Sequence, residues 1–226
     1  MLDENVGTDP HAQIYLQPIA APSILGLYGL AGATFMVAAN MAHWFGTSAT
    51  SLYLFPFAAI FGGLAQFLAG MWAFRARDGV ATAVHGMWGS FWMAYGILNV
   101  IFAVGKIPPP VGAFPEIGFW FIVLAAITWV AVGAASAESS ALAILLTFLA
   151  AGSTTAAIGE LTGLAWLMTL TGWLFIISSI VAWYTGSALM LEEACGHEVW
   201  TLGKSKQSGM RVSTGMGEPG VIRGQA

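Results

Sequence analysis

The chain has 226 residues, of which 58% are hydrophobic and 8% are charged; its formal net charge is −4 and its mean hydropathy is +0.77. Soluble domains carry about 25% charged residues, so these values exclude an ordinary water-soluble fold. They predict an all-α integral membrane protein surrounded by a lipid bilayer. The sequence has no basic cluster that would indicate nucleic acid as a partner. Between positions 13 and 191 the charged residues are too few to solvate a surface: Arg75, Arg77, Asp78, Lys106, Glu116, Glu138 and Glu160.

Residues 1–21 form a polar N-terminal segment that begins MLDENVGTDPH. This segment has neither a basic region nor an early apolar run, so we expect no cleavable signal peptide. The first apolar helix would then direct insertion into the membrane. The single cysteine, Cys195, excludes a disulfide bond within the chain.

The segment 22–191 contains the membrane-spanning helices. About 20 apolar residues are needed to cross the hydrocarbon core of a bilayer. The short segments between the apolar stretches have turn chemistry, and the last of them, GELTG, can also be an interruption within one helix. We expect six transmembrane helices, with the following approximate ranges: 23–45, 52–74, 81–105, 117–135, 141–158 and 166–191.

Six spans place both termini on the same side of the membrane. With the N-terminus inside, the basic residues after the second and sixth spans face the cytoplasm, as the positive-inside rule requires. Residues 192–226 are then a cytoplasmic tail, which we expect to be mostly disordered because it is rich in Gly, Ser and Lys. The plasma membrane or inner membrane is the expected location. The basic residues concerned are Arg75, Arg77, Lys204, Lys206 and Arg211.

The third predicted span carries an unusual polar and aromatic stripe within HGMWGSFWMAYGILN, residues 85–99. On a helix its members fall within an arc of about 80°. Lipid does not require such a stripe, so we expect this face to lie against other helices or a solute. The stripe consists of His85, Trp88, Trp92, Tyr95 and Asn99.

Three side-chain amides lie within predicted spans: Asn40, Gln66 and Asn99. An amide turned to lipid would lose hydrogen bonds worth several kcal/mol, so all three are expected to point inward. Gln66 lies in a row of small residues spaced four apart, a spacing typical of closely packed membrane helices. Each amide either lines a pore or bonds a neighbouring helix.

The sequence does not predict an enzyme. His43 and His85 lie at depths that differ by roughly 24 Å, so one haem iron cannot bind both. The spacing of acids, histidines and cysteine predicts neither a metal site nor a cofactor site. Glu160, near the outer end of the fifth span, is either a loop carboxylate or a residue at the mouth of a pore.

Several segments resemble the acetate uptake transporter family, the succinate–acetate permeases. They are APSILGL at 21–27, FGGLAQFLAGMWAFRARDG at 61–79, WGSFW at 88–92, TGWL at 171–174 and LEEACGHEVWTLG at 191–203. The resemblance implies a homohexamer with one pore within each protomer. It also implies transport of acetate and related short-chain monocarboxylates. Transport of succinate and coupling to protons stay open.

The resemblance further implies an apolar constriction made by Leu30, Trp88 and Leu149. The family has Phe and Tyr at the first two of these positions, so an indole N–H replaces a phenol hydroxyl here. His85 occupies the position of an apolar aromatic residue, where it either handles a proton or packs against neighbours. The family signature also has Asn at position 21 and Pro at position 24, where this chain has Ala21 and Ile24.

A carboxylate solute needs hydrogen-bond donors along the path. Its pKa is about 4–5, like those of Asp and Glu side chains, so it is an anion at neutral pH. The predicted substrate-binding residues are Gln66, Asn40, Asn99, His85 and Trp92. Two alternatives stay open: a six-helix channel for urea or amides, and a structural membrane scaffold.

Overall fold

The computed structural model describes residues 20–47, 49–105 and 107–204. Their regular elements are helices, apart from one isolated β-bridge between Ser139 and Lys204. The expected all-α class is therefore confirmed. The elements are α1 (Pro22–Met41), α2 (Thr50–Ala58), the π-helix η1 (Ala59–Ala65), α3 (Gln66–Ala76), α4 (Gly79–Ala103), α5 (Pro115–Ala135), α6 (Ser140–Thr162) and α7 (Ala165–Cys195).

Five of the helical runs in the described part are long and apolar enough to cross a membrane: α1, the continuous run Thr50–Ala76, α5, α6 and α7. The chain is thus built as a multi-pass membrane protein. Helix α4 has 25 residues and carries the polar and aromatic stripe; it is not among these five runs. The expected six spans coincide in position with these five runs and α4.

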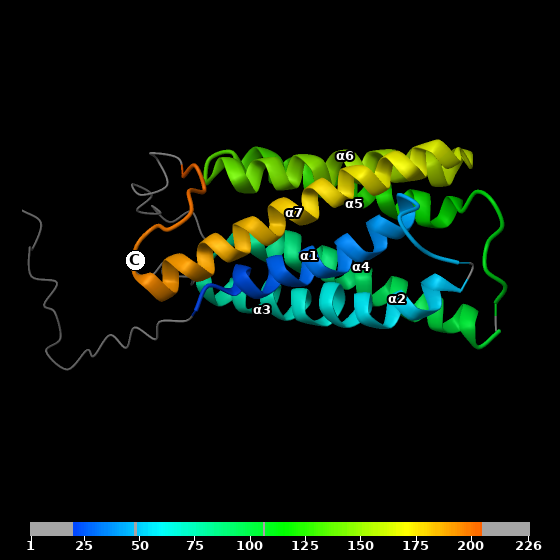
Figure 1. Ribbon diagram of the computed structural model, residues 1–226, viewed down its shortest axis with the longest axis horizontal. Coiled ribbons are helices and arrows are strands. Elements are labelled where there is room, and N and C mark those ends of the chain that lie inside the picture. Colours follow the sequence, from blue (N-terminus) through cyan, green and yellow to red (C-terminus); the bar gives the residue numbers. More distant parts are fainter. Residues whose placement is uncertain (1–19, 48, 106, 205–226) are drawn as a thin grey trace, which may run out of the picture.

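The helices run roughly along one common axis (Figure 1). Helix α6 packs on both α5 and α7, helices α1, α3 and α4 pack on one another, and the packing of α1 on α7 joins the two groups. Helices α4 and α5 make little contact. The two ends of the described chain lie at the same end of the bundle (Figure 1), together with the α3–α4 and α5–α6 turns. The other connections lie at the opposite end.

Local sequence explains several helix ends. Pro22 occupies the first turn of α1, where its missing N–H has no helical partner to lose. Asp78 caps α4 by accepting a hydrogen bond from the Ala81 backbone N–H at 2.8 Å. Gly163 and Gly196 adopt φ of 72° and end α6 and α7, because glycine takes this left-handed conformation at little cost.

The second helical run, Thr50–Ala76, changes from α-helix to π-helix near its middle and then back to α-helix. Pro56 lies inside α2 and cannot donate a helical hydrogen bond, and η1 follows three residues later. In η1, Gly62 and Gly63 lie directly against α1 and α4, since a Cβ at Gly62 would be 2.7 Å from the Ala33 Cβ and 2.8 Å from Trp92 Cδ1. The π-helix was not expected from the sequence.

Two helix boundaries differ from the expected ones. Helix α1 ends at Met41, not at 45, and His43 takes a left-handed conformation with φ of 61° just beyond it. Helix α7 continues to Cys195, and residues 196–204 fold back on the bundle. Residues 192–204 therefore pack on the bundle, and a mostly disordered tail stays a prediction, because residues 205–226, like residues 1–19, lie outside the described part.

The returning segment 196–204 is held by specific contacts. Leu202 is buried against Ala141 and Ala188, and the Trp200 ring stacks on Tyr184 with a centroid distance of 5.4 Å. The backbone N–H groups of Ser140 and Ala141 donate to the carbonyls of Gly203 and Leu202. The first backbone amides of a helix have no partner within the helix, and these carbonyls accept their hydrogen bonds at α6. The hydrogen bonds hold the returning segment against the start of α6.

Gly89→Ala is expected to destabilise the bundle, because helices α3 and α4 meet there through backbone. A Cβ at Gly89 would lie 2.6 Å from Phe67 N and 2.9 Å from Phe67 Cα, and such overpacking costs about 1–3 kcal/mol. Gly86→Ala is the matched control, since a Cβ there meets nothing within 4 Å. Thermal unfolding in detergent should show a lower midpoint for Gly89→Ala alone. Equal midpoints would contradict this account of the α3–α4 contact.

Candidate functional site

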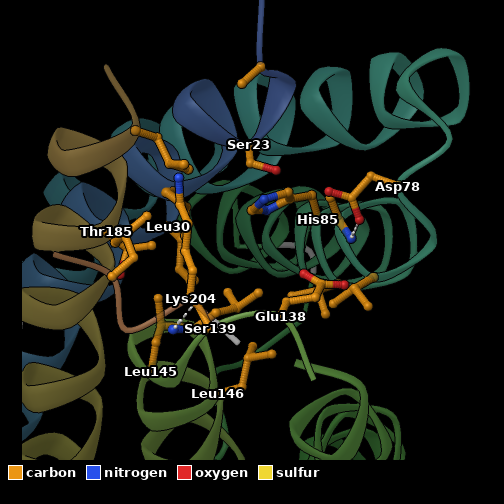
Figure 2. A pocket seen from close by; sticks show the side chains of 18 residues that line it. Ser23, Leu30, Asp78, His85, Glu138, Ser139, Leu145, Leu146, Thr185 and Lys204 are labelled. Atoms are coloured by element: carbon orange, nitrogen blue, oxygen red, sulfur yellow. Dashed lines mark hydrogen bonds between the residues drawn. The ribbon is translucent and has the colours of Figure 1, made fainter. Parts of the chain in front are cut away.

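A cavity of about 260 Å³ opens at the bundle end that carries both described chain ends. Helices α1, α4 and α6 begin beside it. The start of α1 has no side-chain cap, whereas Asp78 caps α4 and the carbonyls of Leu202 and Gly203 accept from the first amides of α6. Ser23, Ser139 and Thr185 add hydroxyl groups to its wall (Figure 2). We call this space the inner cavity. It favours an anionic or polar solute.

The mouth of the inner cavity carries charges of both signs. Lys204 lines it and forms an ion pair with Glu192, with the Lys204 Nζ 2.5 and 2.6 Å from the two carboxylate oxygens. Asp78 and Glu138 lie on the opposite side of the mouth (Figure 2). The ion pair ties the returning segment 196–204 to α7, so this segment forms part of the entrance.

Leu30 and His85 lie at the deep end of the inner cavity. The His85 ring rests on Gly26, because a Cβ at Gly26 would lie 2.6 Å from three ring atoms. Gln66 Nε2 lies 3.4 Å from His85 Nδ1. The two atoms are close enough for a hydrogen bond between the Gln66 amide and the His85 ring. His85 and Gln66 thus form one buried pair between α3 and α4.

The three residues of the implied constriction are buried in the bundle interior. Leu30, Trp88 and Leu149 are at most 1% exposed and belong to one apolar cluster. The Trp88 indole donates to Thr128 Oγ1 at 3.1 Å and makes an edge contact with Phe175. These contacts fix the indole, and we call the three residues the apolar block.

A second cavity, of about 530 Å³, opens at the other end of the bundle. We call it the outer cavity. Asn40, His43 and Glu160 line it; Asn40 Nδ2 donates to the Phe45 carbonyl at 2.8 Å. Glu160 lies within the last turn of α6, so its interpretation as a loop carboxylate is wrong. Its side chain belongs to the wall of the outer cavity.

The apolar block lies between the two cavities along the chain. On α1, Leu30 lines the inner cavity, whereas Asn40 and Met41 line the outer one. On α6, Leu149 lies between Leu146 of the inner cavity and Gly159 of the outer one. The block thus lies at a height between the two cavities on both helices.

The remaining predicted contact residues are buried on α4. Trp92 is 5% exposed, and its Nε1 has no hydrogen-bond partner in the described part. Asn99 is also buried, but its Nδ2 donates to the Tyr95 carbonyl one turn back. The predicted stripe of α4 thus faces the bundle interior, although Asn99 is engaged with its own helix.

Sequence reasoning missed a set of buried hydroxyl groups around the block. Most of them donate to carbonyls, as Ser153 does to Leu149 at 2.8 Å, and Thr155 and Thr171 bond each other at 2.7 Å. Thr34 is an exception, because its buried Oγ1 has no partner in the described part. Its position four residues after Leu30, on the same helical face, was the available signal.

The comparisons with known proteins agree with this architecture. The family model described as "GPR1/FUN34/yaaH family" matches residues 5–197. The solved structure titled "Structure of the bacterial acetate channel SatP" aligns with a TM-score of 0.75 at 21% sequence identity, covering 82% of this chain and 100% of that chain. No curated protein matches the chain. At this identity the structural match shows a shared fold.

Proposed function

Because the chain belongs to the GPR1/FUN34/yaaH family, we propose that it carries acetate and related short-chain monocarboxylates across a membrane. The path runs inside a single bundle, from the inner cavity through the apolar block to the outer cavity. One observation carries this proposal: cavities with polar side chains in their walls open at the two ends of one bundle, and buried apolar residues that include Leu30, Trp88 and Leu149 lie between them. The acetate channel that shares the fold supports the choice of solute.

The chemistry of the path suits a small, weakly held solute. Helix starts and hydroxyl groups at the inner cavity favour a carboxylate, and Lys204 is paired with Glu192. A solute that leaves the cavity loses water at Leu30, Trp88 and Leu149, so large or strongly hydrated solutes are excluded. We propose Gln66, His85 and Trp92 as contacts near the block, with Asn40 at the outer cavity. Asn99 contributes less because its own helix engages it.

The proposal includes six spans with both termini in the cytoplasm of a cell whose plasma or inner membrane holds the protein. Arg75 lies in the last turn of α3 and Arg77 follows that helix, at the bundle end where the described chain begins and ends, and this supports the orientation. Assembly as a homohexamer belongs to the proposal through the family resemblance. The molecular mass of the protein in detergent tests whether it is a hexamer. We propose no enzymatic activity.

Uptake of labelled acetate into proteoliposomes, compared with uptake of labelled urea, tests this function. We expect acetate uptake above that of protein-free liposomes and urea uptake equal to theirs. Faster urea than acetate uptake would favour an amide channel and would contradict the proposal. Trp166→Ala serves as a control for reconstitution, because this tryptophan is exposed at the start of α7, away from the block.

A further inference from the structure

The returning segment 196–204 places Lys204 in the wall of the inner cavity, next to Ser139 (Figure 2). An isolated antiparallel bridge joins the backbones of these two residues, and the Ala141 backbone N–H donates to the Leu202 carbonyl at 3.1 Å. The Leu202 side chain is buried. These contacts fix the backbone at Lys204 against the start of α6, and they determine where its ammonium group can reach.

Lys204 contacts a carboxylate of the protein as well as the cavity. Its Nζ bonds both carboxylate oxygens of Glu192. Glu192 lies in the last turn of α7 and is not among the residues that line the inner cavity. Lys204 thus borders the cavity while it holds an anion of the same chemical group as acetate.

The Lys204–Glu192 ion pair is accessible to water. The two side chains are 40% and 32% exposed, and ion pairs with such exposure contribute little to stability. A second carboxylate that takes the place of Glu192 conserves the charge-assisted hydrogen bonds of the ammonium group. Exchange of one carboxylate for the other therefore costs little free energy.

Lys204 is also the group in the cavity wall that distinguishes an anion from a neutral solute. Among the described residues that line the inner cavity, it is the one lysine or arginine. Two acids, Asp78 and Glu138, line the cavity as well. A carboxylate that enters is repelled by these acids and attracted by Lys204, so entry of anions depends on this lysine.

We propose that Lys204 determines the preference of the inner cavity for carboxylates, by exchanging the Glu192 carboxylate for that of the solute. Glu192 competes with the solute for the ammonium group. The competition keeps the solute weakly held, as release from a transport path requires. This inference rests on the proposed function and assigns a specificity-determining residue to the inner end of the path.

Two variants that break the same ion pair should have opposite effects on acetate transport. Lys204→Gln removes the attracting group and should raise the half-saturating acetate concentration about two- to fivefold. Glu192→Gln removes the competitor and should lower this concentration by a similar factor, with a lower maximal rate because the solute leaves more slowly. If the pair only fastened the returning segment, both variants would shift the concentration in the same direction.

The measurement is the initial rate of labelled acetate uptake by inside-out membrane vesicles, over a range of acetate concentrations. These vesicles present the proposed cytoplasmic end of the full-length protein to the added solute. Vesicles from cells without the protein provide the background. Thermal unfolding of each variant in detergent reports separately on attachment of the returning segment.

Two further variants serve as controls. Glu193→Gln removes the same charge from the next residue of α7, which is exposed and points about 100° away around the helix; it should leave the half-saturating concentration unchanged. Lys204→Arg keeps the positive charge and should stay within about twofold of the wild-type concentration.

A charge exchange separates contact with the solute from attachment of the segment. The double variant Lys204→Glu with Glu192→Lys keeps the net charge and places opposite charges at the same two positions, but the residue in the cavity wall is then an acid. The half-saturating concentration should stay at least as high as in Lys204→Gln. A return to the wild-type concentration would show that the ion pair acts only by holding the segment and would overturn the inference.

An unchanged half-saturating concentration in Lys204→Gln would also overturn the inference, as would shifts of Lys204→Gln and Glu192→Gln in the same direction. The proposed function fails on a different result. It fails only if vesicles with the wild-type protein take up no more acetate than vesicles without it, so the two failures are distinguishable.

Discussion

Trp88→Ala is expected to raise the ratio of succinate to acetate uptake several-fold. The indole is 1% exposed and lies in the apolar block with Leu30 and Leu149. An aromatic side chain buries about 150–250 Å², so its removal should widen the proposed path enough for a longer dicarboxylate. The measurement is uptake of both labelled acids into proteoliposomes.

Variants at the same position separate a wider path from a damaged fold. Trp→Ala in a core costs about 3–5 kcal/mol, and Thr128 loses the indole N–H that it accepts, so oligomer mass must be checked. Trp88→Tyr introduces the residue that the family resemblance implies at this position and should keep a low ratio. Trp88→Leu provides an intermediate size. An unchanged ratio in well-assembled Trp88→Ala and Trp88→Leu would remove Trp88 from the path.

Gln66→Leu is expected to slow acetate uptake at least tenfold. The substitution removes the hydrogen bond to His85 Nδ1 and the free Oε1 together, and each lost partner of a buried polar group costs about 1–3 kcal/mol. Asn99→Leu is the matched control. It also removes a buried amide from an inward face, but that amide bonds the Tyr95 carbonyl of its own helix.

Initial rates of acetate uptake at equal protein content provide the measurement. Asn99→Leu should keep most of the wild-type rate. If both variants slow uptake equally, the amides act through helix packing and not through contact with the solute. If Gln66→Leu keeps the wild-type rate, its amide serves only to hold His85.

The helices and the family were predictable from the sequence because both depend on local patterns. Apolar runs of membrane length determine where helices lie, and motifs such as FGGLAQFLAG carry the family likeness. The stripe on α4 was also predictable, because helical geometry alone places His85, Trp88 and Trp92 on one face. Their burial in the structure agrees with that expectation.

What could not be predicted depends on how separate helices fit together. The pairing of Gln66 with His85 requires the relative height of α3 and α4, which η1 adjusts within the second helical run. Residues 196–204 fold back because Leu202 packs against Ala141 and Trp200 stacks on Tyr184. A nine-residue segment rich in polar residues gives no periodic signal for such a contact.

Covalent blockage at Leu30 tests most directly whether the solute passes through the interior of one bundle. Leu30 lines the deep end of the inner cavity, so a cysteine there is within reach of a small methanethiosulfonate reagent. The variant Leu30→Cys is made with Cys195→Ser, because Cys195 is exposed. Acetate uptake should fall to the level of protein-free liposomes after modification, and acetate should slow the reaction. Full modification, verified by mass, with unchanged uptake would contradict a path through this bundle.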